Sequence, residues 1–131
     1  MEIKSRFKTY RVEFVESLSL LGELAAEDDT FFVIDRAVYE RYREQLPAGS
    51  AGRLFLMAAA EEHKTIATAL AICEQMTAMP AKRNTHLVSI GGGIVQDVTG
   101  FVATSLYRGI RWTFFPTTLH RREIVAQLQG L

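Results

Sequence analysis

The chain has 131 residues, enough for one domain with its own hydrophobic core. Hydrophobic residues make up 48% of the sequence and charged residues 23%, which is ordinary for a globular protein. The 15 basic and 15 acidic residues balance, so the basic excess that favours a nucleic-acid or acidic-membrane partner is missing. The single cysteine, Cys73, excludes an internal disulfide and suits a cytoplasmic location. Residues 1–6 lack the apolar stretch that is typical of a signal peptide, and no apolar run approaches the ~20 residues that span a bilayer.

Strand-like and helix-like segments alternate through the first part of the chain. Residues 9–15 alternate polar and apolar side chains and predict a half-exposed strand. Leucines at helical spacing over 18–25 predict a short helix. Residues 31–34 form a continuous apolar run typical of a buried strand. Residues 38–46 then predict a helix that Pro47 ends.

The same alternation continues after a glycine-containing loop. Residues 53–59 and 86–90 predict two further strands, and residues 66–79 predict a helix between them. A helix over 95–106 and a strand over 112–115 complete the series. This repeat of strand and helix predicts an α/β fold with a parallel sheet and right-handed crossovers.

Two apolar stripes predict which helix faces pack on the sheet. The stripe of the helix over 66–79 consists of Ile66, Leu70 or its neighbour Ala69, Cys73 and Met76. The stripe of the next helix consists of Val95, Val98, Phe101, Val102, Ser105 and Leu106, with Gly109 as the C-terminal cap. We treat residues 1–119 as one domain and 120–131 as an atypical tail that could form an amphipathic turn or two.

The sharpest local signal is the turn Gly91-Gly92-Gly93 between a strand and a helix. Without a Cβ, these residues let the backbone approach a ligand closely. The helix behind them offers free N–H groups and a partial positive charge, which suit a phosphate. We therefore favour phosphate binding over the alternative, a turn that is only flexible. The usual dinucleotide fingerprint is absent, because Gln96 stands where its third glycine belongs and no acid follows at the required spacing.

Other candidate residues leave two interpretations open. Asp35, at the end of a buried strand, could bind ribose hydroxyls or cap the next helix. Asp97 could contact a ligand or only stabilise its helix. Glu61 and Lys64 could be a surface ion pair three residues apart.

Hydroxyl and imidazole side chains complete the candidates. Thr117 and Thr118, after Pro116, could hold a ligand or cap a helix. The three histidines show no metal-ligand spacing, so the sequence predicts no metal site.

In combination, these motifs resemble a known family. Residues 87–103, with the glycine turn and Asp97, resemble the glycine-rich segment of 3-dehydroquinate synthase and its sugar-phosphate cyclase relatives. Tyr107-Arg108-Gly109 and Pro116-Thr117-Thr118 continue the match in order and spacing. Glu61 and Lys64 resemble the family's Glu-x-x-Lys cofactor segment. The resemblance runs from about Phe31 to Leu119.

The resemblance implies a Rossmann-like parallel sheet flanked by helices, with an N-terminal strand that could run antiparallel. It implies an NAD site in which Asp35, Glu61 and Lys64 hold the adenosine part. Gly91, Gly92 and Gly93 would hold the pyrophosphate, and Asp97, Thr117 and Thr118 would lie near the nicotinamide ribose. Arg108 would reach a substrate phosphate across the interface of a homodimer.

The family's complete enzyme uses NAD and a divalent metal, zinc or cobalt, to eliminate phosphate from a heptulosonate phosphate and close a carbocycle. The metal ligands belong to a helical C-terminal domain, so we expect this chain by itself to bind NAD weakly and to be inactive. An iron-containing alcohol dehydrogenase is the alternative enzyme family, and a non-catalytic nucleotide-binding or dimerisation module is the alternative of another class. The substrate within the cyclases, and whether its pathway is aromatic biosynthesis or a specialised one, stay open.

Overall fold

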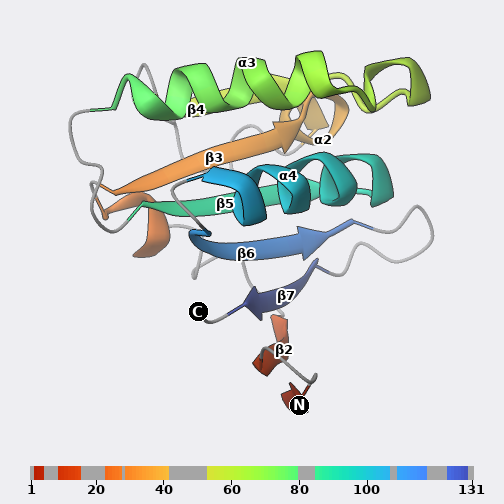
Figure 1. Ribbon diagram of the computed structural model, residues 1–131. Coiled ribbons are helices and arrows are strands. Elements are labelled where there is room, and N and C mark those ends of the chain that lie inside the picture. Colours follow the sequence, from red (N-terminus) through yellow and green to blue (C-terminus); the bar gives the residue numbers. More distant parts are fainter. Residues whose placement is uncertain are drawn as a thin grey trace.

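Among the residues that the structure describes, seven strands form one mixed sheet in the computed structural model (Figure 1). The described residues are 2–4, 9–15, 23–27, 29–41, 53–79, 85–106, 109–117 and 124–129. The strands are β1 Glu2–Lys4, β2 Thr9–Val15, β3 Thr30–Asp35, β4 Leu54–Met57, β5 His86–Gly91, β6 Arg111–Pro116 and β7 Ile124–Gln129. Their order across the sheet is β1-β2-β7-β6-β5-β3-β4.

The central strands β3, β5 and β6 run parallel, together with β4, as the alternating pattern predicts. Their apolar runs are buried because helices and connecting segments cover the sheet: Phe31 to Ile34 are almost fully inaccessible. The N-terminal strand β2 pairs antiparallel with both of its neighbours, β1 and β7, so the implied antiparallel pairing of an N-terminal strand is confirmed.

The prediction of a helical turn in the last residues is wrong. Residues 124–129 form β7, which pairs antiparallel with β2 on one side and with β6 on the other. A strand in this position satisfies backbone N–H and C=O groups of all three strands, which a short isolated helix could not do. The expected domain boundary near residue 119 stays a prediction.

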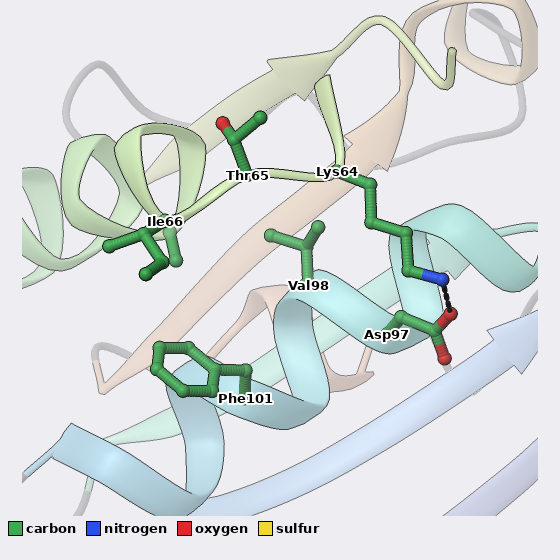
Figure 2. A pocket seen from close by; sticks show the side chains of 7 residues that line it. Lys64, Thr65, Ile66, Asp97, Val98 and Phe101 are labelled. Carbon is green, nitrogen blue, oxygen red and sulfur yellow. Dashed lines mark ion pairs between the residues drawn. The ribbon is translucent and has the colours of Figure 1, made fainter. Parts of the chain in front are cut away.

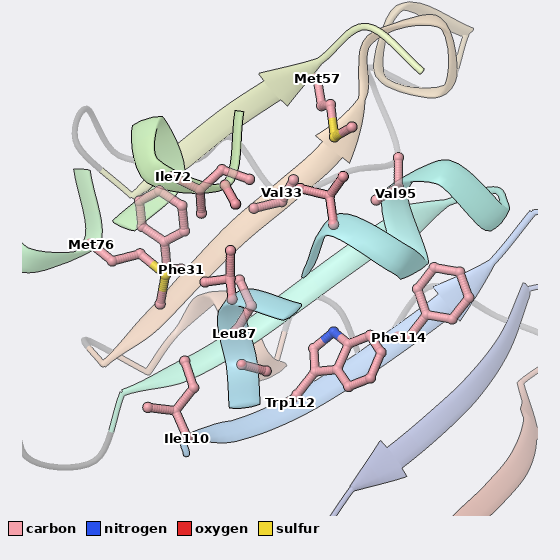
Figure 3. Close-up of a cluster of buried hydrophobic side chains, with 14 of the residues drawn as sticks. Phe31, Val33, Met57, Ile72, Met76, Leu87, Val95, Ile110, Trp112 and Phe114 are labelled. Atoms are coloured by element: carbon pink, nitrogen blue, oxygen red, sulfur yellow. The ribbon is translucent and has the colours of Figure 1, made fainter. Parts of the chain in front are cut away.

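The helices are α2 Arg36–Arg41, the 3₁₀ turn η1 Glu61–His63, α3 Ile66–Thr77 and α4 Gly93–Ser105. Helices α3 and α4 lie on the same face of the sheet (Figure 1), and their buried residues share one core cluster with Phe31, Leu87 and Trp112 (Figure 3). Helix α2 contributes to the second cluster, on the opposite face. Of the helix predicted over 18–25, the structure describes a turn at 23–25, and residues 42–46 of the next predicted helix lie outside the described residues.

The stripe predicted for α3 is confirmed at Ala69, Cys73 and Met76 and is wrong at Ile66 and at the other choice, Leu70. Ile66 and Leu70 are 69% and 57% exposed, whereas the alternative Ala69 is buried together with Ile72 and Met76. Cys73 is partly buried against the same cluster, as expected. The small Ala69 side chain lets the helix approach the sheet closely, so the larger leucine faces outward.

The stripe predicted for α4 is partly right. Val95, Val98 and Val102 are buried, but Phe101 is 53% exposed and Ser105 is exposed as well. Thr99 takes the core position instead, because its hydroxyl finds hydrogen-bond partners there. The C-cap of α4 is Leu106 and not Gly109 as predicted; Gly109 has a φ of 109° and donates its N–H to the Leu106 carbonyl oxygen at 2.8 Å, so it turns the chain beyond the helix end.

The chain path creates a switch point at the carboxyl edge of the parallel strands. From β3 the chain moves outward to β4 through α2, and it then returns past β3 to β5 through α3. The direction of travel reverses between β3 and β5. The crevice outside the carboxyl ends of two such strands is where open α/β sheets bind ligands.

Candidate functional site

The glycine turn lies at this switch point, directly after β5. A Cβ on Gly91 would come within 2.8 Å of Val95 Cγ2 and 3.1 Å of Asp35 Cβ, so this glycine is needed for packing between β5, β3 and α4. A Cβ on Gly92 or Gly93 would meet nothing within 4 Å among the described residues outside its own helix. The space in front of these two glycines is therefore open to a ligand.

The start of α4 points its unpaired backbone donors at this open space. Gly92 is the N-cap residue and supplies no side-chain cap, and the first helical bond runs from Gln96 N to the Gly92 carbonyl oxygen at 3.0 Å. The N–H groups of Gly93, Ile94 and Val95 thus have no partner within the helix. A 13-residue helix adds a partial positive charge at the same place, so the turn fits an anionic phosphate group.

Asp35 and Thr117 lie on either side of the glycine turn, and each is held by a hydrogen bond. Asp35 accepts a hydrogen bond from Ala37 N at 2.9 Å through Oδ1, so it caps the start of α2, which is the structural alternative considered for it. This bond uses one carboxylate oxygen, and a carboxylate can accept further hydrogen bonds from a ligand through the other. On the other side, Thr117 N donates to the Gly91 carbonyl oxygen at 2.9 Å, which places Thr117 beside the glycine turn.

Lys64 and Asp97 form an ion pair that the sequence does not predict. Lys64 Nζ lies 2.8 Å from Asp97 Oδ2, and the two side chains are 44% and 54% exposed (Figure 2). The hydrogen bond and charge of Asp97, with the charge of Glu61, raise the pKa of Lys64 above its ordinary value. Lys64 therefore pairs with α4 rather than with Glu61 three residues earlier, because the fold brings the β4–α3 connection next to the first turns of α4.

A shallow hollow of about 170 Å³ continues from this ion pair between α3 and α4 (Figure 2). Its charged end is made by Lys64 and Asp97, and Thr65 caps α3 beside them by accepting from Thr68 N. The remaining lining is apolar and consists of Ile66, Ala69, Val98 and Phe101. The edge thus combines an anion-binding turn, charged hydrogen-bonding groups and an apolar wall, which are the elements of a small-molecule site.

Two candidate residues, Arg108 and Thr118, lie outside the described residues. Within the described ranges, no group of three or more His, Cys, Asp or Glu side chains could hold a metal ion. Nor does any helix in those ranges have the length and apolar character needed to cross a membrane. The structure therefore brings Asp35, the three glycines and Thr117 to one edge, with Lys64 and Asp97 alongside, and Glu61 one 3₁₀ turn away.

The α/β fold is shared with sugar phosphate cyclases. A solved structure of 2-epi-5-epi-valiolone synthase from Streptomyces hygroscopicus, with NAD+ and Zn2+ bound, superimposes with a TM-score of 0.62 at 29% identity, over 77% of this chain and 29% of that chain. Residues 54–124, more than half of the chain, match the 3-dehydroquinate synthase N-terminal family. The chain belongs to this family, the first of the two enzyme families that its motifs suggested.

Curated relatives agree with the family. The chain is 32% identical over 125 residues to the 3-dehydroquinate synthase of Clostridium tetani, covering 91% of this chain and 34% of the relative. It is 40% identical over 88 residues to the 3-dehydroquinate synthase of Pelobacter propionicus, covering 63% of this chain and 24% of the relative. The chain thus spans about a quarter to a third of the length of these relatives.

Proposed function

We propose that the chain is the NAD-binding domain of a 3-dehydroquinate synthase-like enzyme. The observation that carries this proposal is the glycine turn at the switch point, where Gly92 and Gly93 leave open space in front of free N–H groups. A similar structure with NAD+ bound supports the choice of dinucleotide. In this role the start of α4 binds the pyrophosphate.

Charged and hydroxyl groups around the turn orient the rest of the dinucleotide. Asp35, Glu61 and Lys64 bind the adenosine part, since carboxylate oxygens accept from ribose hydroxyls and the ammonium group donates to them. Asp97, which pairs with Lys64, and Thr117, which lies beside the glycine turn, serve the nicotinamide ribose in this proposal. Thr118 and Arg108 are assigned to the same ribose and to a substrate phosphate by the family resemblance alone.

In the complete enzyme we expect a heptulosonate phosphate as the substrate, with phosphate elimination and ring closure as the reaction. Bound NAD supplies a reversible hydride acceptor for such a sequence. The residues of this chain hold that cofactor, and Arg108 binds the substrate phosphate of the other subunit. The divalent metal, zinc or cobalt, polarises the substrate oxygen in the complete enzyme.

The affinity of this chain for NAD should be low. Lys64 and Asp97 are about half exposed, and the hollow beside them is shallow, so much of a bound dinucleotide would stay in water. Ordering a flexible ligand costs free energy that few contacts must offset. We expect a dissociation constant nearer ~1 mM than ~1 μM, a difference of roughly 4 kcal/mol.

Replacing Gly92 by valine tests the proposal directly. The residue has φ −92° and ψ −164°, which valine adopts readily, and its Cβ would meet no neighbour, so Gly92→Val should fold. The added side chain would fill the place of the pyrophosphate and abolish NAD binding in ligand-detected NMR. Ala78→Val, at an exposed position beyond α3, is the matched control and should bind NAD normally. Equal binding by wild type and Gly92→Val would refute the assignment.

We also propose that the chain forms a homodimer. Three large apolar side chains, Ile66, Leu70 and Phe101, are more than half exposed on neighbouring helices. Ile66 and Phe101 line the same hollow, and adjacent exposed apolar side chains of this kind can form an interaction surface. Sedimentation equilibrium at micromolar concentration should give twice the monomer mass for wild type and a shift toward monomer for Phe101→Ser. A monomeric wild type would contradict the proposal.

A further inference from the structure

A buried chain of hydrogen bonds connects β6 to α4 through β5. Trp112 Nε1 donates to Ser89 Oγ at 3.0 Å, and Ser89 Oγ lies 3.1 Å from Thr99 Oγ1. The Thr99 hydroxyl is also 2.6 Å from the Val95 carbonyl oxygen, to which it donates. Ser89 and Thr99 are completely buried, and Trp112 is 9% exposed. The chain of bonds therefore contains three polar side chains that are almost inaccessible to water. They serve as hydrogen-bond partners for one another.

This chain of bonds ends at the helical turn that packs against the glycine turn. Val95 is the third residue of α4, and its side chain occupies the space where Gly91 would carry a Cβ. Next to Thr99, Gly100 allows the Trp112 ring to approach, since a Cβ there would lie 3.1 Å from the ring. The indole ring thus contacts α4 by packing at Gly100 and reaches Thr99 through the polar chain.

We infer that Ser89, Thr99 and Trp112 are positioning residues for the start of α4 and hence for the phosphate-binding N–H groups of the glycine turn. Apolar contacts between a helix and a sheet tolerate small sliding motions, whereas hydrogen bonds are directional and weaken steeply when their angle changes. Sliding of α4 would also separate Thr99 Oγ1 from the buried Ser89 hydroxyl, and the loss of a buried hydrogen-bond partner is costly. The polar chain consequently favours one position of the helix along β5. This inference rests on the proposed binding of NAD at the turn.

Thr99→Val is the central test, because valine keeps the shape of threonine and replaces only the hydroxyl, by a methyl group that cannot form hydrogen bonds. We expect the NAD dissociation constant to rise roughly tenfold, which corresponds to about 1.4 kcal/mol and to the strength of one net hydrogen bond. Thr99→Ser restores the hydroxyl and should recover most of the affinity. The amide signals of Gly93 and Ile94 should move in the ¹H–¹⁵N spectrum of unliganded Thr99→Val and return toward wild type in Thr99→Ser.

Two controls separate positioning from loss of stability. Thr104→Val removes an exposed hydroxyl of the same helix that bonds to the carbonyl oxygens of Gly100 and Phe101, and it should bind NAD as wild type does. Ile72→Val destabilises the buried core at α3 without touching the polar chain, and it should also bind normally at a temperature where it is folded.

The inference is overturned if folded Thr99→Val binds NAD with wild-type affinity, or if Ile72→Val loses as much affinity as Thr99→Val. Should Thr99→Val fail to fold, Trp112→Phe removes the first donor and keeps an aromatic ring. A loss of roughly threefold in affinity is then expected, and unchanged affinity overturns the inference. Gly92→Val serves as the reference for the proposed function. If it abolishes binding while Thr99→Val has no effect, the NAD site stands and the positioning role fails.

Discussion

The two edges of the parallel strands differ in how far their polar groups are exposed to solvent. At the carboxyl edge, Lys64 and Asp97 are about half exposed, and Gly92 and Gly93 face open space. At the amino edge, Thr30 and His86, partners in the β3–β5 register, are buried, and Thr30 Oγ1 and His86 Nδ1 have no hydrogen-bond partner among the described residues. The accessible polar groups at the carboxyl edge can exchange water for a ligand, whereas the buried groups at the amino edge affect the stability of the fold.

The largest expected effect belongs to His86 at the amino edge. Its Nε2 lies 2.6 Å from Thr113 Oγ1, and burial together with the charge of Arg111 lowers its pKa to about 4 from the ordinary 6.5. Between these pH values the unfolded chain binds more protons than the folded one, so stability falls as the pH drops from 6.5 to 4. The loss should be on the order of 3 kcal/mol.

Urea unfolding of wild type and His86→Gln between about pH 4 and pH 7 measures this effect. The difference between the two proteins isolates His86 from the carboxylates, which titrate in part of the same range. A wild-type stability that declines no more steeply with acid than that of His86→Gln would show that His86 is freely protonated in the folded state. Burial of His86 at the amino edge would then have no measurable effect on stability, and the proposed difference between the two edges would fail.

A smaller effect, on binding rather than stability, is expected at the carboxyl edge. Lys64→Met removes the ammonium group of an exposed ion pair, and such pairs contribute little to folding, so the unfolding midpoint should not change measurably. The NAD dissociation constant should rise by roughly threefold to tenfold, because a charged donor to the ligand is lost.

Two measurements on two variants test this second prediction. Urea midpoints and NMR titrations with NAD are measured on Lys64→Met and on Lys64→Arg, which keeps the charge facing Asp97. A clear loss of stability with unchanged binding in Lys64→Met would reverse the roles assigned to the two edges. Recovery of affinity in Lys64→Arg would strengthen them.

Much of the fold follows from local patterns. The continuous apolar runs of β3, β5 and β6 and the apolar spacing of α4 predict the parallel core, and three adjacent glycines predict the open turn between β5 and α4. The helix faces are harder to predict, because periodicity is satisfied equally by Leu70 and by its neighbour Ala69. Packing against the sheet selects the smaller side chain.

The sequence by itself predicts the strands and helices of the core, because apolar periodicity and the position of glycines depend on a few neighbouring residues. The strand at residues 124–129 depends instead on long-range pairing, since β2 and β6 supply its backbone partners from distant parts of the chain. The same holds for the pairing of Lys64 with Asp97 and for the contacts of Ser89 with Thr99 and Trp112. Such contacts depend on where separate elements meet in space, and no local spacing encodes that.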